Sequence, residues 1–216
     1  MSTKRYFTPN EVLLHNSTSD LWVSFLGKVC NLTKVCQEYK GSDLLKPIKA
    51  FAGKDVSMWF NPKSGELKTH IDQDTGLRQP CFPHGRFVHG PPPYPASDWS
   101  TDFGLPWWKN KHLLVGNLSK NVKRIRIINV LASVEDTLEV CAEETINDIS
   151  ERYRANFNSH ARSYTWKCEG RCLDMNKTMA ENGILDDQPR FYRVNLPEDI
   201  YLPSLLVFYN DDLTED

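Results

Sequence analysis

The chain has 216 residues, of which 40% are hydrophobic and 25% are charged, the composition of an ordinary globular protein with room for one large domain or two small ones. The formal net charge is −2, so no overall positive field favours nucleic acid or an anionic membrane, and we expect neither as a partner. No apolar run approaches the roughly 20 residues of a membrane span, and the first residues lack the apolar core of a signal peptide. The sequence therefore predicts a protein of the cytoplasm without a membrane anchor.

The start of the chain predicts a capped helix followed by a hairpin. Thr8 precedes Pro9 and stands three residues before Glu11, which is a capping box with proline at the first helical position. In residues 21–25 apolar side chains alternate as in a strand. The letters "LGK" then turn the chain into "VCNL", which predicts the second strand of the pair.

Short helices follow the hairpin. Thr33 is expected to cap a short helix that ends near Gly41. Two more short helices are expected on either side of "AGKD", with Asp55 capping the second.

Residues 72–111 are rich in turns and hold seven of the 13 prolines, yet they are not composed like a disordered linker. Their aromatic residues are Phe82, Phe87, Tyr94, Trp99, Phe103, Trp107 and Trp108. We interpret the segment as an ordered excursion that packs over the first domain. The alternative is an exposed loop that binds a partner.

The last part of the chain predicts a small sheet with one helix. Strand patterns cover residues 123–140 as a hairpin, 163–173 as a second pair and 202–210 as a closing strand. Between them, Ile146, Ile149 and Tyr153 fall on one face of an amphipathic helix. A sheet that grasps a single helix is the expected arrangement.

The segments "FTPNEVLLHN", "DLWVSFLGKVCNLT" and "AGKDVSMWF" resemble the cytochrome b5 family, and "HLLVGNLS" resembles its closing strand. The resemblance implies an α+β domain over residues 5–119, interrupted by an insertion of about 72–111. In that family the domain clamps haem b between two helix hairpins, each of which supplies one axial histidine. Here Tyr39, in "YKGS", stands where the first histidine is normal, and His70 is the histidine within reach of the second position.

The resemblance therefore implies Tyr39 and His70 as the axial ligands of the haem iron. Phenolate does ligate haem iron, and as a hard anionic donor it should favour Fe(III) over Fe(II). Cys36, one helical turn earlier, is a rival ligand because thiolate also binds haem. The alternatives are that Tyr39 is a packing residue with a hydrogen-bonded hydroxyl, that His70 is a solvated loop residue, and that the pocket has been lost.

Residues 121–216 resemble ubiquitin, through "DTLEVCAEETINDISERY" and "YTWKCEGRCLDMNKTMAENGILDD". The acidic ending "NDDLTED" has no di-glycine, so we expect a docking domain and not a conjugated modifier. A cytochrome b5-like domain followed by a ubiquitin-like domain resembles a family associated with the radial spokes of motile cilia. This resemblance implies a non-enzymatic, haem-binding subunit of the ciliary axoneme, a part of the cytoskeleton, with radial spoke proteins as partners. It also implies a role in regulating ciliary beating through redox signalling. A soluble electron-transfer protein and a haem-free interaction scaffold are the alternatives.

Other patterns in the sequence do not predict a functional site. The stretch "DQDTG", residues 72–76, predicts a turn and not a calcium loop, because Pro83 falls where the bidentate glutamate belongs. His84 and His89 lack an accompanying set of carboxylates or cysteines, and we expect both at the surface. The six cysteines are expected as reduced thiols. No nucleophile–base pattern or phosphate loop is present, so we expect no enzymatic activity.

Overall fold

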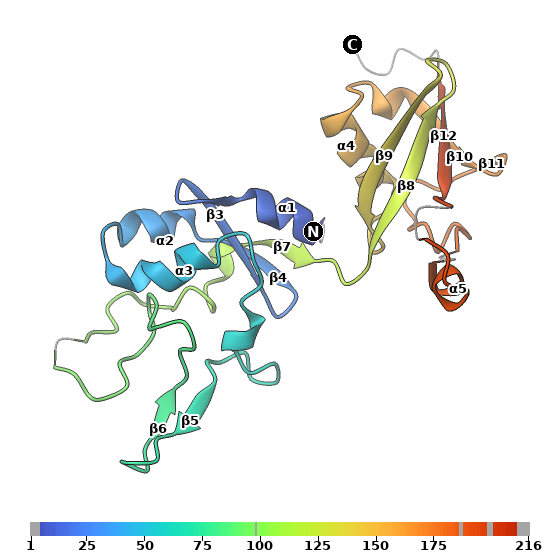
Figure 1. Ribbon diagram of the computed structural model, residues 1–216. Coiled ribbons are helices and arrows are strands. Elements are labelled where there is room, and N and C mark those ends of the chain that lie inside the picture. Colours follow the sequence, from blue (N-terminus) through green and yellow to red (C-terminus); the bar gives the residue numbers. More distant parts are fainter. Residues whose placement is uncertain (1–4, 98, 186–187, 198–200, 211–216) are drawn as a thin grey trace. The chain divides into compact units, whose positions relative to one another are not determined.

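The structure is a computed structural model that describes residues 5–97, 99–185, 188–197 and 201–210 (Figure 1). The chain folds as two compact units, one up to Leu118 and the other from Ser119 on. The sequence prediction places this boundary between residues 119 and 121. The predicted α+β class is confirmed, since both units combine helices with a sheet.

The first unit contains a five-stranded sheet in the order β1-β7-β4-β3-β2. Its strands are β1 (Tyr6–Phe7), β2 (Asn16–Ser17), β3 (Asp20–Phe25), β4 (Lys28–Asn31) and β7 (Leu114–Leu118). β1 pairs with β7 in parallel, and the other pairs are antiparallel. The predicted hairpin is β3–β4, and its turn residues Leu26 and Gly27 have φ values of 48° and 74°. Positive φ at both central positions matches the twist of the flanking strands.

The helices of the first unit are short. They are α1 (Pro9–Leu14), α2 (Thr33–Glu38) and α3 (Lys46–Ala50), with 3-10 turns at Asp43–Leu45, Ser57–Trp59 and Lys111–Leu113. The predicted capping box of α1 is confirmed: Thr8 Oγ1 accepts from the backbone N–H of Glu11, and the Glu11 carboxylate accepts from that of Thr8. Figure 1 shows α2 and α3 side by side.

The predicted cap of α2 is wrong. Leu32 occupies the N-cap position and makes no side-chain cap, because Thr33 Oγ1 accepts instead from the backbone N–H of Leu21 at 3.0 Å. Thr33 thus ties α2 to β3. The predicted role of Asp55 is only partly met: its carboxylate accepts from the N–H of Ser57 at 2.9 Å, but the second helix is a single 3-10 turn.

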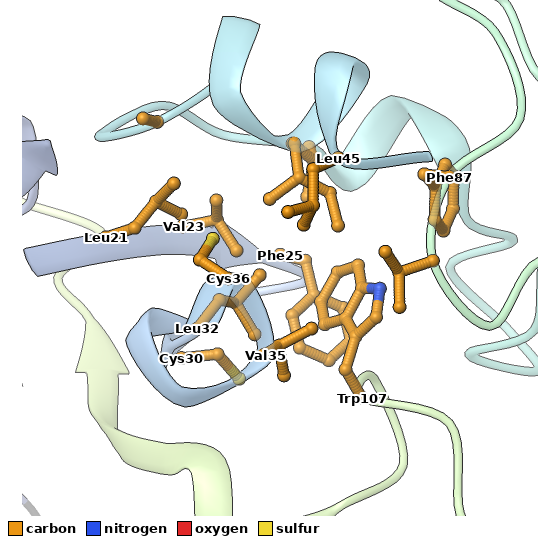
Figure 2. Close-up of a cluster of buried hydrophobic side chains, with 14 of the residues drawn as sticks. Leu21, Val23, Phe25, Cys30, Leu32, Val35, Cys36, Leu45, Phe87 and Trp107 are labelled. Atoms are coloured by element: carbon orange, nitrogen blue, oxygen red, sulfur yellow. The ribbon is translucent and has the colours of Figure 1, made fainter. Parts of the chain in front are cut away.

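The insertion packs into the core of the first unit, as expected. Its first strand, β6 (Arg78–Pro80), pairs with β5 (Thr69–Ile71), which immediately precedes the insertion, and this hairpin projects away from the five-stranded sheet (Figure 1). Further along, Phe87 and Trp107 are each 1% exposed. Figure 2 shows both rings in one cluster with Phe25, Val35 and Leu45. The ring of Phe87 also stacks on Trp59, with centroids 4.7 Å apart. These aromatic residues seal the insertion onto its own domain.

The second unit is a five-stranded sheet with a helix packed on it. Its order is β11-β10-β12-β8-β9, in which β12 and β8 are parallel and the other pairs are antiparallel. The strands are β8 (Val122–Asn129), β9 (Val134–Cys141), β10 (Tyr164–Cys168), β11 (Arg171–Cys172) and β12 (Ser204–Tyr209). The helices are α4 (Ile146–Asn156) and α5 (Gln188–Arg193), with a 3-10 turn at Ala161–Ser163.

The core of the second unit follows the predicted helix face. Ile146, Ile149 and Tyr153 of α4 are buried against sheet residues such as Ile125 and Leu205. The predicted acidic ending, residues 211–216, lies outside the described residues. Among the residues that the structure does describe, no helix has the length and apolar character needed to cross a membrane.

We predict that Phe87→Ala destabilises the first unit by about 3–5 kcal/mol, because it removes a fully buried ring and leaves a cavity. Amide hydrogen exchange in β3 and β4 measures this loss for the first unit alone. Tyr94→Ala is the control, since Tyr94 lies in the same insertion but is 53% exposed, and it should change the free energy by no more than about 0.5 kcal/mol. Equal effects of the two substitutions would show that the insertion does not belong to the core.

Candidate functional site

Tyr39 ends helix α2 with its phenol at the margin of the core. Its backbone N–H donates to the carbonyl oxygen of Val35 at 3.1 Å, which completes the last turn. The chain then leaves the helix through Gly41, whose φ of 90° is one that glycine adopts without strain. The side chain of Tyr39 is half-buried and packs against the main hydrophobic cluster. Its hydroxyl is therefore placed next to the insertion.

His89 is the insertion residue that meets Tyr39. The preceding residue, Val88, is fully buried and donates its backbone N–H to the carbonyl oxygen of Leu44 at 3.2 Å. His89 has a φ of 66°, and Gly90 follows at a point where a Cβ would lie 2.8 Å from a neighbouring phenylalanine ring. This anchored turn directs the imidazole toward the end of α2.

Three contacts fix the imidazole of His89. Its Nε2 lies 3.2 Å from the hydroxyl oxygen of Tyr39. Its Nδ1 accepts a hydrogen bond from the backbone N–H of Trp107 at 3.0 Å. Phe103 stacks on its ring, with centroids 4.3 Å apart and planes 14° from parallel. The expectation that His89 is a surface residue is thus wrong, because the insertion folds back over it; His84 is exposed, as expected.

Both partners are neutral near pH 7. Burial raises the pKa of Tyr39 above its ordinary value of 10.0, and the charge of Glu38 adds to this rise. Burial also lowers the pKa of His89 below 6.5, with Glu38 acting in the opposite direction. A neutral imidazole whose Nδ1 is an acceptor carries its proton on Nε2. His89 is therefore the donor and the oxygen of Tyr39 the acceptor.

The pair lies in the wall of an open cavity of about 820 Å³. One side of the cavity is formed by α2 and the residues just before it, and the other by the insertion and the start of β7. The apolar lining comes from Val35, Phe103, Leu105, Trp107, Leu113 and Val115, and the lining includes a second imidazole, His112. The rest of the lining is polar or charged: Ser19, Asp20, Asn31, Thr33, Lys34, Gln37, Glu38 and Asn110. The cavity thus combines an apolar part with many polar groups, and concave sites of this kind bind small molecules.

Comparison with known proteins identifies the family. A family described as "Cytochrome b5-like Heme/Steroid binding domain" matches residues 8–118. The chain is 53% identical over 211 residues to the cytochrome b5 domain-containing protein 1 of Xenopus laevis, a match that covers 98% of this chain and 97% of that protein. The chain belongs to the cytochrome b5-like family. The predicted resemblance of the first unit is thereby confirmed.

Further relatives match to different extents. The human cytochrome b5 domain-containing protein 1 is 52% identical over 212 residues, which cover 98% of this chain and 92% of that protein. A Delta(8)-fatty-acid desaturase of Helianthus annuus is 40% identical over 73 residues, which cover 32% of this chain and only 15% of that enzyme. The relatives that match along nearly the whole chain are thus named for a domain and not for a reaction.

The residues around the cavity fit the haem that the family description implies. The phenol oxygen of Tyr39 is a ligand type of haem iron, and the aromatic and aliphatic side chains of the lining suit the apolar macrocycle. The indole nitrogen of Trp107 is buried without an acceptor among the described residues, but the same holds for Trp22, Trp59, Trp108 and Trp166, so this donor does not single out the cavity.

The structure does not bring His70 to Tyr39. His70 lies on β5, exposed, opposite Gln79 of β6, and it is not among the residues that line the cavity. No described contact joins it to Tyr39. The Tyr39–His70 ligand pair therefore stays a prediction, while the structure pairs Tyr39 with His89.

Cys36 is poorly placed to rival Tyr39. Its side chain is 5% exposed and lies in the hydrophobic cluster with Leu21 and Val23 (Figure 2). Burial raises the pKa of its thiol above 9.0, which disfavours the thiolate that binds metals. Cys36 does not line the cavity either.

The turn at residues 72–76 is also as expected. A carboxylate oxygen of Asp72 accepts from the backbone N–H groups of Asp74 and Thr75 at 2.8 and 3.1 Å, which is an Asx-type turn. Within the described ranges, no group of three or more histidine, cysteine or acidic side chains is arranged to hold a metal ion. A haem site is not such a group, because the porphyrin supplies most of the iron's ligands.

Proposed function

We propose that this chain is a non-enzymatic, haem-binding regulatory and structural subunit that holds haem b through Tyr39, preferentially in the oxidised state. The observation that carries the proposal is the phenol of Tyr39 in the wall of a partly apolar cavity, hydrogen-bonded to a neutral histidine. When bound, haem would supply an iron centre with two oxidation states. Tyr39 would hold the iron, and Phe103, Leu105 and Trp107 would keep water from the macrocycle.

The choice of tyrosine decides the kind of function. A hard, anionic oxygen stabilises ferric iron more than ferrous iron, whereas a pair of histidines retains haem in both states. Electron transfer requires the second behaviour. Haem occupancy that depends on oxidation state suits a sensor or regulator, so Tyr39 supports redox signalling over electron transport. His70 remains the candidate for the second ligand that the family resemblance suggests.

We further propose that the second unit is a ubiquitin-like β-grasp that acts as a docking domain. Its single long helix and the parallel pair β12–β8 at the centre of an otherwise antiparallel sheet support this reading. The resemblance to ciliary proteins supports radial spoke proteins of the axoneme as partners and the regulation of ciliary beating as the role.

A haem-free scaffold is the second candidate, and one observation favours it. Tyr39 already accepts a hydrogen bond from His89, and Phe87 and Trp107 fill the core beside them. The core of the first unit is therefore packed with protein side chains alone.

Titration of the purified chain with ferric hemin separates these candidates. We predict about one equivalent bound with a Soret band, and loss of at least about 100-fold in affinity in Tyr39→Phe, since even an outer-shell partner of a metal ligand is worth about 10–100-fold. His70→Ala should weaken binding if His70 is the second ligand. Tyr94→Phe and His84→Ala are the matched controls, because they make the same chemical changes at exposed residues that do not line the cavity.

The variants also show how the proposal fails. Unchanged affinity and spectrum in both Tyr39→Phe and His70→Ala would show that neither residue is a ligand. A wild-type chain that gives no Soret band with hemin would be a scaffold.

Reduction is the second test. Dithionite should weaken hemin binding, because a phenolate donor loses its advantage when the iron becomes ferrous. Transfer of the haem to an acceptor such as apomyoglobin, followed by absorbance, measures the dissociation rate in each state. Slower transfer after reduction would contradict a tyrosine ligand and favour an electron carrier.

The location is tested in ciliated cells. We expect the tagged protein to stay with the axoneme after detergent extraction, and its loss to disturb beating more than ciliary assembly. Immunoblotting of the soluble and axonemal fractions measures the first, and high-speed imaging of cilia the second. Recovery with soluble cytosol or with membranes of the endoplasmic reticulum would instead support the electron-transfer alternative.

A further inference from the structure

The insertion residue His89 has a fixed orientation that the proposed haem site does not itself explain. Its backbone follows buried Val88, its ring stacks on Phe103, and its Nδ1 is bonded to the backbone of Trp107. A side chain held on three sides cannot rotate freely, so the direction in which Nε2 points is built into the fold. That direction is the hydroxyl oxygen of Tyr39, 3.2 Å away.

The contact at Nδ1 determines what Nε2 can do. A histidine that binds a metal through one nitrogen usually donates its other N–H to a carboxylate or a carbonyl oxygen. His89 has the opposite arrangement, because Nδ1 meets the amide N–H of Trp107, which is a donor. The proton of the neutral ring is consequently on Nε2, where a ligand would need a lone pair. His89 is arranged as a hydrogen-bond donor and not as a ligand of iron.

The distance supports the same conclusion. Metal bonds to nitrogen and oxygen ligands of about 2 Å each would place two ligands on opposite sides of an ion about 4 Å apart. The oxygen of Tyr39 and Nε2 of His89 lie 3.2 Å apart, at the distance of a direct hydrogen bond. An iron does not fit between them, whereas Tyr39 can accept this bond and still present its remaining oxygen lone pair elsewhere.

We propose that His89 is a positioning residue that donates its Nε2–H to the oxygen of Tyr39 while that oxygen ligates ferric haem iron. This inference rests on the proposed haem function and deepens it. The hydrogen bond draws negative charge from the phenolate, and it orients the ring of Tyr39. A hydrogen bond to an ionised oxygen is roughly twice as strong as one between neutral groups, so the contact gains strength when Tyr39 binds the metal. On binding, the phenol O–H bond breaks, the proton passes to solvent and no electron is transferred.

Removing the donor should change the electronic properties of the site more than its occupancy. A phenolate without the hydrogen bond is a stronger donor to ferric iron. The midpoint potential should therefore fall, and the phenolate-to-iron charge-transfer band should move to longer wavelength. Apparent hemin affinity should fall by about 10-fold or more, as for other outer-shell partners of metal ligands.

The experiment compares four full-length chains loaded with hemin: wild type, His89→Phe, His89→Gln and His84→Phe. His89→Phe keeps an aromatic ring against Phe103 but has no donor, and His89→Gln restores an N–H near the position of Nε2. His84→Phe is the control, since His84 is an exposed histidine of the same insertion. Visible absorption and redox titration are the readouts, with circular dichroism to show that each chain is folded.

We expect the red shift and the lower potential in His89→Phe, near wild-type values in His89→Gln, and no change in His84→Phe. Loss of the ferric phenolate spectrum in His89→Phe, as in Tyr39→Phe, would show that His89 is needed as a ligand and would overturn the inference. An unchanged spectrum and potential in a folded His89→Phe would overturn it as well.

A measurement without haem separates this inference from the proposed function. Long-range nitrogen–proton NMR of the haem-free chain should show His89 protonated at Nε2 and bare at Nδ1. The opposite tautomer would refute the donor role even if hemin binds. The expected tautomer in a chain that fails to bind hemin would refute the haem function and, with it, the role of His89 as a partner of an iron ligand.

Discussion

The burial of two insertion rings, Phe87 and Trp107, is the constraint on which the first unit depends. Both are about as inaccessible as any side chain of the core, and both come from a segment with little regular structure. The burial of these rings anchors the backbone beside each of them to the core. The turn at His89 and the amide of Trp107 are then fixed relative to α2.

This arrangement links packing to chemistry through one peptide group. The N–H of Trp107 belongs to a residue whose ring is buried, and the same residue sets the tautomer of His89. His89 in turn donates a hydrogen bond to the phenol oxygen of Tyr39. The hydrogen bond to Tyr39 is thus held in place by the core. A substitution deep in the hydrophobic cluster would therefore alter the hydrogen bond to Tyr39 without contacting Tyr39 itself.

The proposed oxygen donor would also distinguish this chain from a haem protein with two histidine ligands. A bis-histidine site is indifferent enough to oxidation state to keep its haem through repeated cycles. A phenolate binds ferric iron more strongly than ferrous iron, and a hydrogen bond from His89 would reduce this preference without abolishing it. In the proposed site, the balance between the phenolate and this hydrogen bond would set how strongly haem retention depends on redox conditions. Fold membership alone does not determine such a property, because it depends on one donor atom and one partner.

Several features were determined by the sequence alone. The capping box at Thr8 and Glu11, the turn at Leu26 and Gly27, the buried face of α4 and membership of the cytochrome b5-like family all depend on neighbouring residues or on motifs that local chemistry makes recognisable. Aromatic content alone indicated that the insertion is packed. The predicted cap at Thr33 is wrong because the hydroxyl oxygen of Thr33 accepts a hydrogen bond from the backbone N–H of Leu21, a strand residue 12 positions earlier in the chain.

The partner of Tyr39 was decided only by the tertiary structure. His89 is 50 residues away, in a segment without helical or strand periodicity, and its neighbours in the sequence are prolines, glycines and aromatic residues that suggest a surface loop. Its glycine neighbour and its place in "RFVHG" hinted at a tight turn but not at what the turn would face. The histidine that contacts the phenol depends on where the rings of Phe87 and Trp107 are buried. Because the hydrophobic effect is non-directional, the sequence pattern does not show which surfaces these rings pack against.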